Sequence, residues 1–518
     1  MSKYAFEPVF DGKNSFQLCI ERASMFPGVG KIAVLASSDC NFSDLSDIQI
    51  EKSDSWTKKS VLEKISSLSL EVSQKGQAEF DCVYFAFADS PFLDPSLAGT
   101  LAERHIRYFA EYSYADGYPN GIAPEILSVG TAGILAKILK DDESVTRDTL
   151  FSVIQKDINA FDIEAEISSV DLRSHRLNFF ADSKRNLLLI KNFITAAKEK
   201  IPSAEDTQKI IEEKPQILRT LPKFFPIQVY GGCPQKCSIC PYPAVTDSLG
   251  RKDFMSAEKF DSILNKIIDF SDDAVIDLSL WGELGLHPEK IKLIEKVLSK
   301  EELSLVIETS GLGWKDEELE TIQKLAAQRN ERNAYKLDQI APLSWIVSLD
   351  TNDPQRYAEL RGAGFAEAQG CAKKLLALFP DDCYMQAVRV KGAEDDTEKF
   401  YRYWKENAPN GEKNIIIQKY DDFCGYLEKK QASDISPVIR QCCWHLMRDI
   451  PILIDGTVLL CKEDLGVLND NKNRVLGNIF SDSLEKIREN SDKYYKEQCE
   501  KKYTQACADC DEYYTYNF

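Results

Sequence analysis

Three cysteines lie close together near the middle of the chain, and their spacing predicts an iron–sulfur site. Cys233, Cys237 and Cys240 form a CxxxCxxC pattern that follows two glycines. Three thiolates on one short loop can bind three of the irons of a [4Fe–4S] cluster. No further cysteine follows nearby, so one iron would stay open to another ligand. The alternative is a structural zinc site, which requires a fourth cysteine or histidine.

A second group of cysteines lies near the end of the sequence and predicts another metal centre. The group consists of Cys442, Cys443, Cys461, Cys499, Cys507 and Cys510. In an intracellular chain, fifteen cysteines indicate metal or redox chemistry rather than disulfides. The sequence has only four histidines, which argues against a histidine-dominated zinc enzyme. The other cysteines are scattered, and we expect them to be small buried apolar side chains: Cys19, Cys40, Cys82, Cys371, Cys383 and Cys424.

The first cysteine group must be positioned by residues 222–425, which read as a series of β/α units. Most of the strand candidates are near-continuous apolar runs, as expected for parallel strands that are covered on both faces. They span residues 226–230, 274–280, 303–308, 344–350, 383–390 and 414–420. Amphipathic helices lie between them, with Ser256 and Asp353 as N-caps. Six such units predict an open, partial barrel whose active end is at the C-termini of the strands.

The rest of the chain predicts two further domains and a connection. Residues 1–197 alternate strand-like and helix-like segments, which indicates an α/β domain. Residues 198–221 are polar with proline near both ends, and we interpret them as a linker. Residues 426–518 form a short, cysteine-dense segment that is rich in turns. The length of 518 residues fits two to four domains of roughly 150 residues each.

The charge of the chain restricts its partners. With 64 Lys and Arg against 83 Asp and Glu, the net charge is −19. Such a surface repels phosphate backbones and anionic lipids, so we expect neither nucleic acid nor membrane as a partner. No apolar run reaches the roughly 18 residues of a membrane span. The first residues also lack the apolar core of a signal peptide, and we therefore expect a cytoplasmic protein.

A three-cysteine loop after the first strand of a β/α barrel resembles the radical S-adenosylmethionine (SAM) superfamily. The resemblance implies that SAM binds the open iron, is cleaved reductively, and yields a radical that abstracts a hydrogen atom from the substrate. It implies that Gly282 and Glu283, after the second strand, hold the amino group of SAM. Further SAM contacts are implied for residues near the ends of the next three strands: Ser310, Ser348, Asp350, Gln386 and Arg389.

The C-terminal cysteines resemble the SPASM/twitch extension that follows many radical SAM barrels. The pattern C-x12-G-x4-C and the sequence of residues 473–490 carry this resemblance. It implies one auxiliary [4Fe–4S] cluster, because too few cysteines follow the pattern for two clusters. The implied ligands are Cys443, Cys461, Cys507 and Cys510. Cys442 and Cys499 are the residues most able to exchange roles with them, and a four-cysteine zinc site is the alternative.

Three segments of the first domain resemble motifs of cytidylyltransferase-like GT-A domains, in the same order. They are residues 83–94, 118–125 and 176–182. In active members two aspartates hold Mg²⁺ against a triphosphate, and Asp89 and Asp182 stand at those positions. The glycine- and arginine-rich loop that cradles the phosphates is missing, so transfer chemistry is not expected. The resemblance implies a degenerate binding or scaffold domain, and leaves open whether it holds Mg²⁺.

The order of the three domains resembles the spiro-SPASM family. It implies a radical SAM oxidoreductase or modifying enzyme that acts on a peptide, a protein or a small molecule, with a low-potential electron donor of the flavodoxin or ferredoxin type. A two-electron oxidation would need a proton acceptor, for which Asp422 or Asp421 stands after the sixth strand. Two alternatives are a non-catalytic iron–sulfur or zinc scaffold with a nucleotide- or sugar-binding domain, and an active nucleotidyltransferase fused to a maturation domain.

Overall fold

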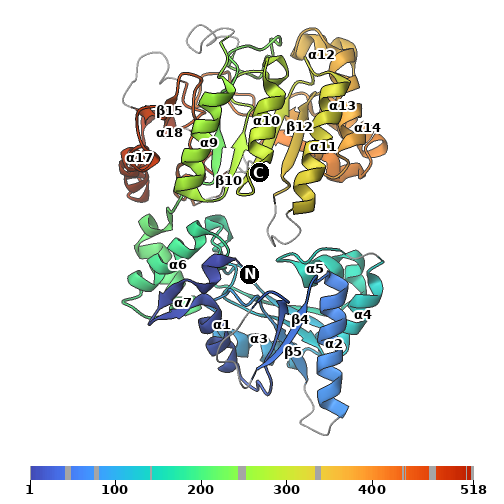
Figure 1. Cartoon of the computed structure of the whole chain (residues 1–518), viewed down its shortest axis with the longest axis vertical. Helices are drawn as coiled ribbons and strands as arrows, with labels where there is room; N and C mark the ends of the chain where they lie inside the picture. Colours follow the sequence, from blue (N-terminus) through green and yellow to red (C-terminus); the bar gives the residue numbers. More distant parts are fainter. Residues whose placement is uncertain are drawn as a thin grey trace. The chain divides into compact units, whose positions relative to one another are not determined.

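The chain folds into two compact units, shown in Figure 1. The computed structural model describes residues 2–514 apart from 41–47, 75–80, 141–142, 243–252, 333–339, 434–436, 438, 466–473 and 509. The first unit runs to Thr220 and the second begins at Leu221. The predicted barrel and the cysteine-rich segment belong to the same unit. No helix in the described part of the chain is long and apolar enough to cross a membrane.

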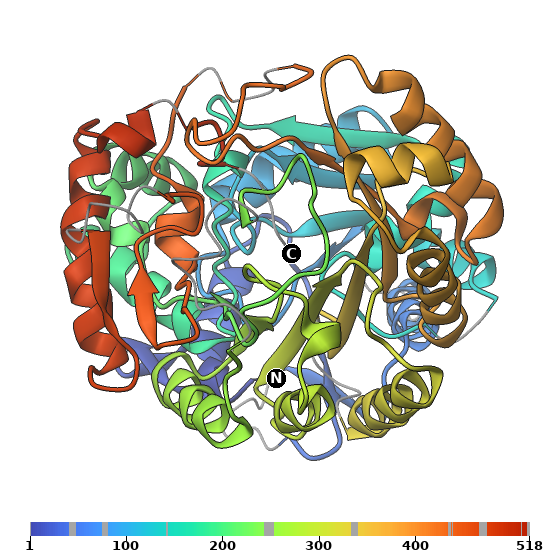
Figure 2. The same cartoon turned by 90° about the horizontal axis from the view of Figure 1, so that it is seen from above.

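The second unit is built on a six-stranded parallel sheet whose strand order follows the chain. The order is β14-β13-β12-β11-β10-β9, and each neighbouring pair is parallel. The strands are β9 (Phe224–Pro226), β10 (Ala274–Asp277), β11 (Leu303–Thr309), β12 (Leu343–Ser348), β13 (Cys383–Arg389) and β14 (Ile415–Lys419). The sheet curls into an open barrel with helices around its outside (Figure 2). The predicted fold class is confirmed.

Amphipathic helices cover the outer face of this sheet, because each one buries a single apolar stripe. They are α9 (Ala257–Ser271), α10 (Lys290–Leu298), α11 (Asp316–Arg332), α12 (Pro354–Leu360), α13 (Phe365–Leu378) and α14 (Glu394–Asn407). Both predicted N-caps are present. The Ser256 side chain accepts from the backbone N–H of Lys259, and that of Asp353 accepts from Arg356.

The cysteine-rich segment is joined directly to the first strand of the barrel. Bridges pair Phe224 with Asp449 and Ile227 with Ile452 in a parallel sense, so the segment covers the outer edge of β9. The strand β9 lies earlier than the predicted 226–230, because residues 224–226 are the ones that pair with β10. The segment continues through α15 (Trp444–Arg448), β15 (Thr457–Leu459), β16 (Val475–Asn478), α17 (Leu484–Cys499) and α18 (Gln505–Ala508).

The first unit is also an α/β fold. A mixed four-stranded sheet has the order β5-β7-β6-β8, and β3 and β4 form a separate parallel pair. Its strands are β1 (Pro8–Phe10), β2 (Lys13–Asn14), β3 (Ala33–Ser37), β4 (Gln49–Ser53), β5 (Cys82–Phe85), β6 (Tyr112–Asp116), β7 (Glu125–Ser128) and β8 (Ile163–Ile167). Its helices are α1 (Ser15–Ser24), α2 (Lys58–Gln74), α3 (Pro95–Arg107), α4 (Thr131–Ile138), α5 (Thr149–Ile154), α6 (Lys184–Ala196) and α7 (Ala204–Glu213).

The segment predicted to be a linker contains α7 and groups with the first unit. A capping box between Ser203 and Asp206 starts the helix. The backbone N–H of Ala204 donates to the Asp94 carboxylate at 2.7 Å, and Asn192 of α6 donates to the carbonyl of Ile217 at 3.0 Å. These contacts fix the segment to the body of the unit.

A chain ending at Thr220 should therefore be more stable than one ending at Ala197. The longer chain keeps Ile210, Ile211 and Leu218 buried, and burying one such side chain contributes roughly 1.5–3 kcal/mol. We expect the free energy of unfolding of the shorter chain to be lower by at least ~3 kcal/mol, measured by circular dichroism in urea. Equal free energies of unfolding would mean that residues 198–220 are a linker.

Candidate functional site

The loop with the first three cysteines follows β9 and is held on two sides. The backbone N–H groups of Lys236 and Ser238 donate to the carbonyls of Arg361 and Leu360, at 3.0 and 2.9 Å. The carbonyl of Gly232 accepts from the backbone N–H of Glu283 at 2.8 Å. The loop is thus attached to the end of α12 and to the turn after β10, both at the C-terminal end of the barrel.

Two of the three thiols pack against apolar side chains. Cys233 and Cys240 pack against a cluster that includes Trp281, Leu453 and Leu459. Burial raises the pKa of Cys233 and of Cys240 to about 12, so these thiols keep their protons until a metal displaces them. In the described part of the chain, no three His, Cys, Asp or Glu side chains are close enough to share one metal ion. In a [4Fe–4S] cluster each cysteine thiolate binds its own iron.

Glu283 connects the turn after β10 to the turn after β11. Its Oε1 accepts from the Thr309 hydroxyl at 2.6 Å and from the backbone N–H of Gly285 at 3.1 Å. Its Oε2 accepts from the hydroxyl and the backbone N–H of Ser310, at 2.6 and 2.8 Å. A carboxylate has about four lone-pair positions, and all are used here. Burial raises the pKa of Glu283, while these donors oppose the rise.

Gly282 allows the turn after β10 to touch the strand that leads to the cysteines. A Cβ at this position would lie 1.9 Å from the carbonyl oxygen of Tyr230 and 3.0 Å from its carbonyl carbon. Both atoms belong to the backbone, so no side-chain rotation relieves the clash. Gly282 is therefore required by close approach of two backbone segments.

A polar network joins the C-terminal ends of β11, β12 and β13. The Ser348 hydroxyl and the Gln386 amide both donate to Glu308 Oε1, each at 2.6 Å. The Gln386 amide also donates to the Ser348 hydroxyl at 2.9 Å. The structure thus brings two predicted residues together and adds Glu308. We did not predict Glu308 because a single carboxylate within a strand-like run has no distinctive local pattern.

Asp350 forms a buried ion pair with an arginine that the sequence did not reveal. Arg361 Nε donates to Asp350 Oδ2 at 2.6 Å, and the side chains are 8% and 5% exposed. Asp350 Oδ1 accepts from the backbone N–H of Val388 at 2.8 Å. Burial raises the pKa of Cys237, and the Arg361 guanidinium opposes that rise, which puts this cation beside the cysteine loop. Arg389, which we predicted as the SAM carboxylate partner, is exposed at the end of β13.

The C-terminal cysteines gather into a group of five and a separate pair. The group contains Cys424, Cys443, Cys461, Cys507 and Cys510. All four predicted ligands belong to it. Cys424 lies beside Cys510 and is only partly buried, so the expectation that Cys424 is an isolated, buried apolar side chain is wrong. Cys424 escaped prediction because it follows β14 and lies outside the C-terminal cysteine pattern.

The pair consists of Cys442 and Cys499, whose sulfur atoms are 3.1 Å apart. Tyr495, one turn before Cys499 on α17, hydrogen-bonds to both thiols. The backbone N–H of Cys443 donates to the Gln498 side chain at 2.9 Å. These contacts separate Cys442 from Cys443, although the two are adjacent in sequence.

The two predicted proton acceptors have different surroundings. Asp422 accepts from the backbone N–H of Gly425 at 2.9 Å and from the Gln431 amide at 3.2 Å, so its carboxylate holds its own loop. Asp421 hydrogen-bonds to Glu463 of the cysteine-rich segment. Burial and the Glu463 carboxylate raise the pKa of Asp421 well above its ordinary value. Their role in catalysis stays a prediction.

The chain is similar to several known proteins. Residues 442–511 match the SPASM family model, an iron-sulfur cluster-binding domain. An uncharacterized protein of Treponema pallidum (strain Nichols) is 32% identical over 378 residues, covering 71% of this chain and 98% of that protein. Streptococcus suis SuiB bound to precursor peptide SuiA is similar over 70% of this chain and 78% of that chain, at 14% identity and a TM-score of 0.40. A cytidylyltransferase from Leptospira borgpetersenii serovar Hardjo-bovis (strain JB197) is similar over 42% of this chain and 89% of that chain, at 14% identity and a TM-score of 0.33.

A CxxxCxxC loop at the mouth of an open parallel barrel, followed by a SPASM domain, defines a radical SAM protein with a SPASM domain. This chain belongs to the same family as the Treponema pallidum protein, which it matches over nearly that protein's whole length.

Changing Gly282 to Ala should reduce the iron bound after anaerobic reconstitution, although every cysteine remains. The added Cβ overlaps the carbonyl oxygen of Tyr230, so the cysteine loop must move. Gly370→Ala is the matched control, because a Cβ there meets nothing within 4 Å. Iron per chain should fall in the first variant and stay unchanged in the control. Normal iron in Gly282→Ala would show that the loop tolerates the displacement.

Proposed function

We propose that this chain is an enzyme that cleaves SAM reductively on a [4Fe–4S] cluster and takes a hydrogen atom from a peptide, protein or small-molecule substrate. The observation that carries the proposal is the convergence of the cysteine loop, the Glu283 turn and the Ser348–Gln386–Glu308 network at one end of the barrel. In parallel β/α barrels this end holds the active site. The cofactors supply the radical chemistry, and the protein binds and orients them.

Cys233, Cys237 and Cys240 fit a cluster with one open iron. Glu283 is assigned to the amino group of SAM. The Ser310 hydroxyl can rotate away from Glu283 Oε2 and leave that oxygen to an ammonium, while the backbone N–H of Ser310 keeps the carboxylate in place. An ammonium is a stronger partner than a hydroxyl for a carboxylate.

Two further assignments follow from burial and charge. Arg361 is the arginine best placed for the carboxylate of SAM, because it is buried beside Cys237, whereas Arg389 is exposed. Its guanidinium is planar and matches a carboxylate with two parallel hydrogen bonds. Gln386 and Ser348, held by Glu308, suit the hydroxyl groups of a ribose, since they can both donate and accept.

The SPASM domain is proposed to hold one auxiliary [4Fe–4S] cluster through Cys443, Cys461, Cys507 and Cys510. Cys424 lies beside Cys510 and is the residue that could replace one of these ligands. The same domain supplies Leu453 and Leu459, which pack against the first cysteine loop and keep water from it. An external donor of the flavodoxin or ferredoxin type would provide the electron, and Asp421 or Asp422 would accept a substrate proton.

Two triple variants distinguish the clusters. The intact protein should bind about eight irons per chain, four in each cluster. Changing Cys233, Cys237 and Cys240 together to Ala should remove about half of the iron and abolish formation of 5′-deoxyadenosine from SAM. Changing Cys443, Cys461 and Cys507 instead should remove the other half and leave SAM cleavage measurable. Purification with zinc and no iron, or no SAM cleavage by the reconstituted protein, would favour a non-catalytic scaffold.

Changing Glu283 to Ala should weaken SAM binding about ten- to a hundredfold, because one charge-assisted hydrogen bond contributes roughly 1.5–3 kcal/mol. Iron content should stay the same, since Glu283 holds the cysteine loop through its backbone N–H and not through its carboxylate. Isothermal titration with SAM and iron analysis measure the two effects. Glu295→Ala, which removes an exposed carboxylate, is the control for charge. An unchanged dissociation constant would remove Glu283 from the SAM site.

A further inference from the structure

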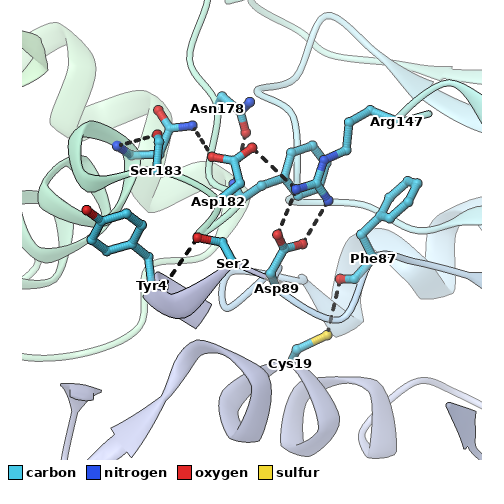
Figure 3. A network of polar contacts seen from close by, with 11 residues as sticks. Ser2, Tyr4, Cys19, Phe87, Asp89, Arg147, Asn178, Asp182 and Ser183 are labelled. Carbon is cyan, nitrogen blue, oxygen red and sulfur yellow. Dashed lines mark hydrogen bonds and ion pairs between the residues drawn. The ribbon is translucent and has the colours of Figure 1, made fainter. Parts of the chain in front are cut away.

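The two aspartates that stand at the positions of metal ligands in the first unit are bound to an arginine (Figure 3). Arg147 Nη1 and Nη2 donate to the two oxygens of Asp89 at 2.8 and 2.7 Å. Nη2 also donates to Asp182 Oδ2 at 3.3 Å. Asp89 follows β5, Asp182 precedes α6, and Arg147 precedes α5. Three segments that are distant in sequence thus meet at one buried cation.

The guanidinium is fixed by aromatic rings as well as by the carboxylates. Its central carbon lies 3.9 Å from the ring centre of Phe180 and 4.7 Å from that of Phe87. The side chains of Arg147 and Asp89 are 12% and 5% exposed. Contact with aromatic rings and bidentate pairing with a carboxylate are both favourable for a guanidinium. Arg147 is therefore a built part of this site.

The positions of the aspartates do not depend on Arg147 alone. The backbone N–H of Ala181 donates to the carbonyl of Asp89 at 2.9 Å, which joins the two acidic segments directly. Asp182 Oδ1 accepts from the Asn186 amide at 2.8 Å. The acidic pair would thus keep its arrangement if the arginine were shortened.

The carboxylate oxygens of Asp89 and Asp182 do not fit a resident Mg²⁺. Mg²⁺ requires oxygen ligands at about 2.0–2.1 Å in octahedral geometry. Both oxygens of Asp89 and one of Asp182 already accept from Arg147, and a second cation between them would be repelled. The arginine brings one positive charge where Mg²⁺ brings two. Arg147 therefore neutralises only part of the charge of the two carboxylates.

We propose that Arg147 occupies the place of a divalent cation in the first unit. Ligand binding by this unit consequently involves no metal ion, and the unit carries out no metal-dependent nucleotidyl transfer. The acidic pair is a latent cation site that the chain's own guanidinium fills. With Arg147 in this position, the first unit holds no Mg²⁺. This assignment does not depend on the iron–sulfur chemistry of the second unit.

The test measures how many Mn²⁺ ions the full-length chain binds. Electron paramagnetic resonance detects the Mn²⁺ that remains free during the titration. In the wild-type chain, Asp89 should bind no Mn²⁺. The Mn²⁺ titrations of wild type and of Asp89→Asn should therefore be the same. Arg147→Met keeps an unbranched apolar side chain between the rings and removes the charge. It should gain one Mn²⁺ ion per chain, and adding Asp89→Asn should remove that ion again. Arg147→Lys keeps a cation and should gain none.

Two outcomes would overturn the proposal. One is a Mn²⁺ ion in wild type that is lost in Asp89→Asn, which would mean that the metal and Arg147 coexist or exchange. This comparison stands even if the Arg147 variants fail to fold. The other is a folded Arg147→Met that gains no Mn²⁺, which would mean that the acidic pair is not a cation site. Circular dichroism and iron content establish that each variant is folded.

Discussion

A buried carboxylate without a counter-ion is costly unless its lone pairs are satisfied, and Glu283 obtains four donors by joining two turns. Its carboxylate takes both polar groups of Ser310, while its backbone N–H holds the loop that carries the cysteines. One residue thus sets the distance between the cysteine loop and the turn after β11. The absence of a side chain at Gly282 is the condition for this arrangement, because the two backbones touch there.

The SPASM domain contacts the barrel at two places. On one side it pairs with β9 through Asp449 and Ile452. On the other side Lys419, at the end of β14, forms an ion pair with Asp511 at 2.9 Å. The domain therefore contacts both outer strands of the open sheet. The edge of β9 is paired in this way and is protected from pairing with other chains.

The sequence predicted the parts of this protein that have local patterns. The cysteine spacing, the apolar runs of the six parallel strands and the helix caps at Ser256 and Asp353 each depend on neighbouring residues, and the structure contains them. The strand predicted over 226–230 begins at Phe224 in the structure, because its position is set by pairing with β10. Arg361, Cys424 and Arg147 were missed for a related reason. Each meets its partners through the fold, and none has a distinctive sequence around it.

The pairing of β9 with residues 449–452 also determines when the barrel can be completed during synthesis. At about 5–20 residues per second, the ribosome makes this outer partner on the order of tens of seconds after β9. During that interval the edge of β9 is unpaired, and the cysteine loop lacks the leucines that later cover it. The cysteine loop is therefore least covered at the same stage at which the edge of β9 is most exposed to wrong strand pairing. When the final segment docks, it covers the edge of β9 and places Leu453 and Leu459 against the loop.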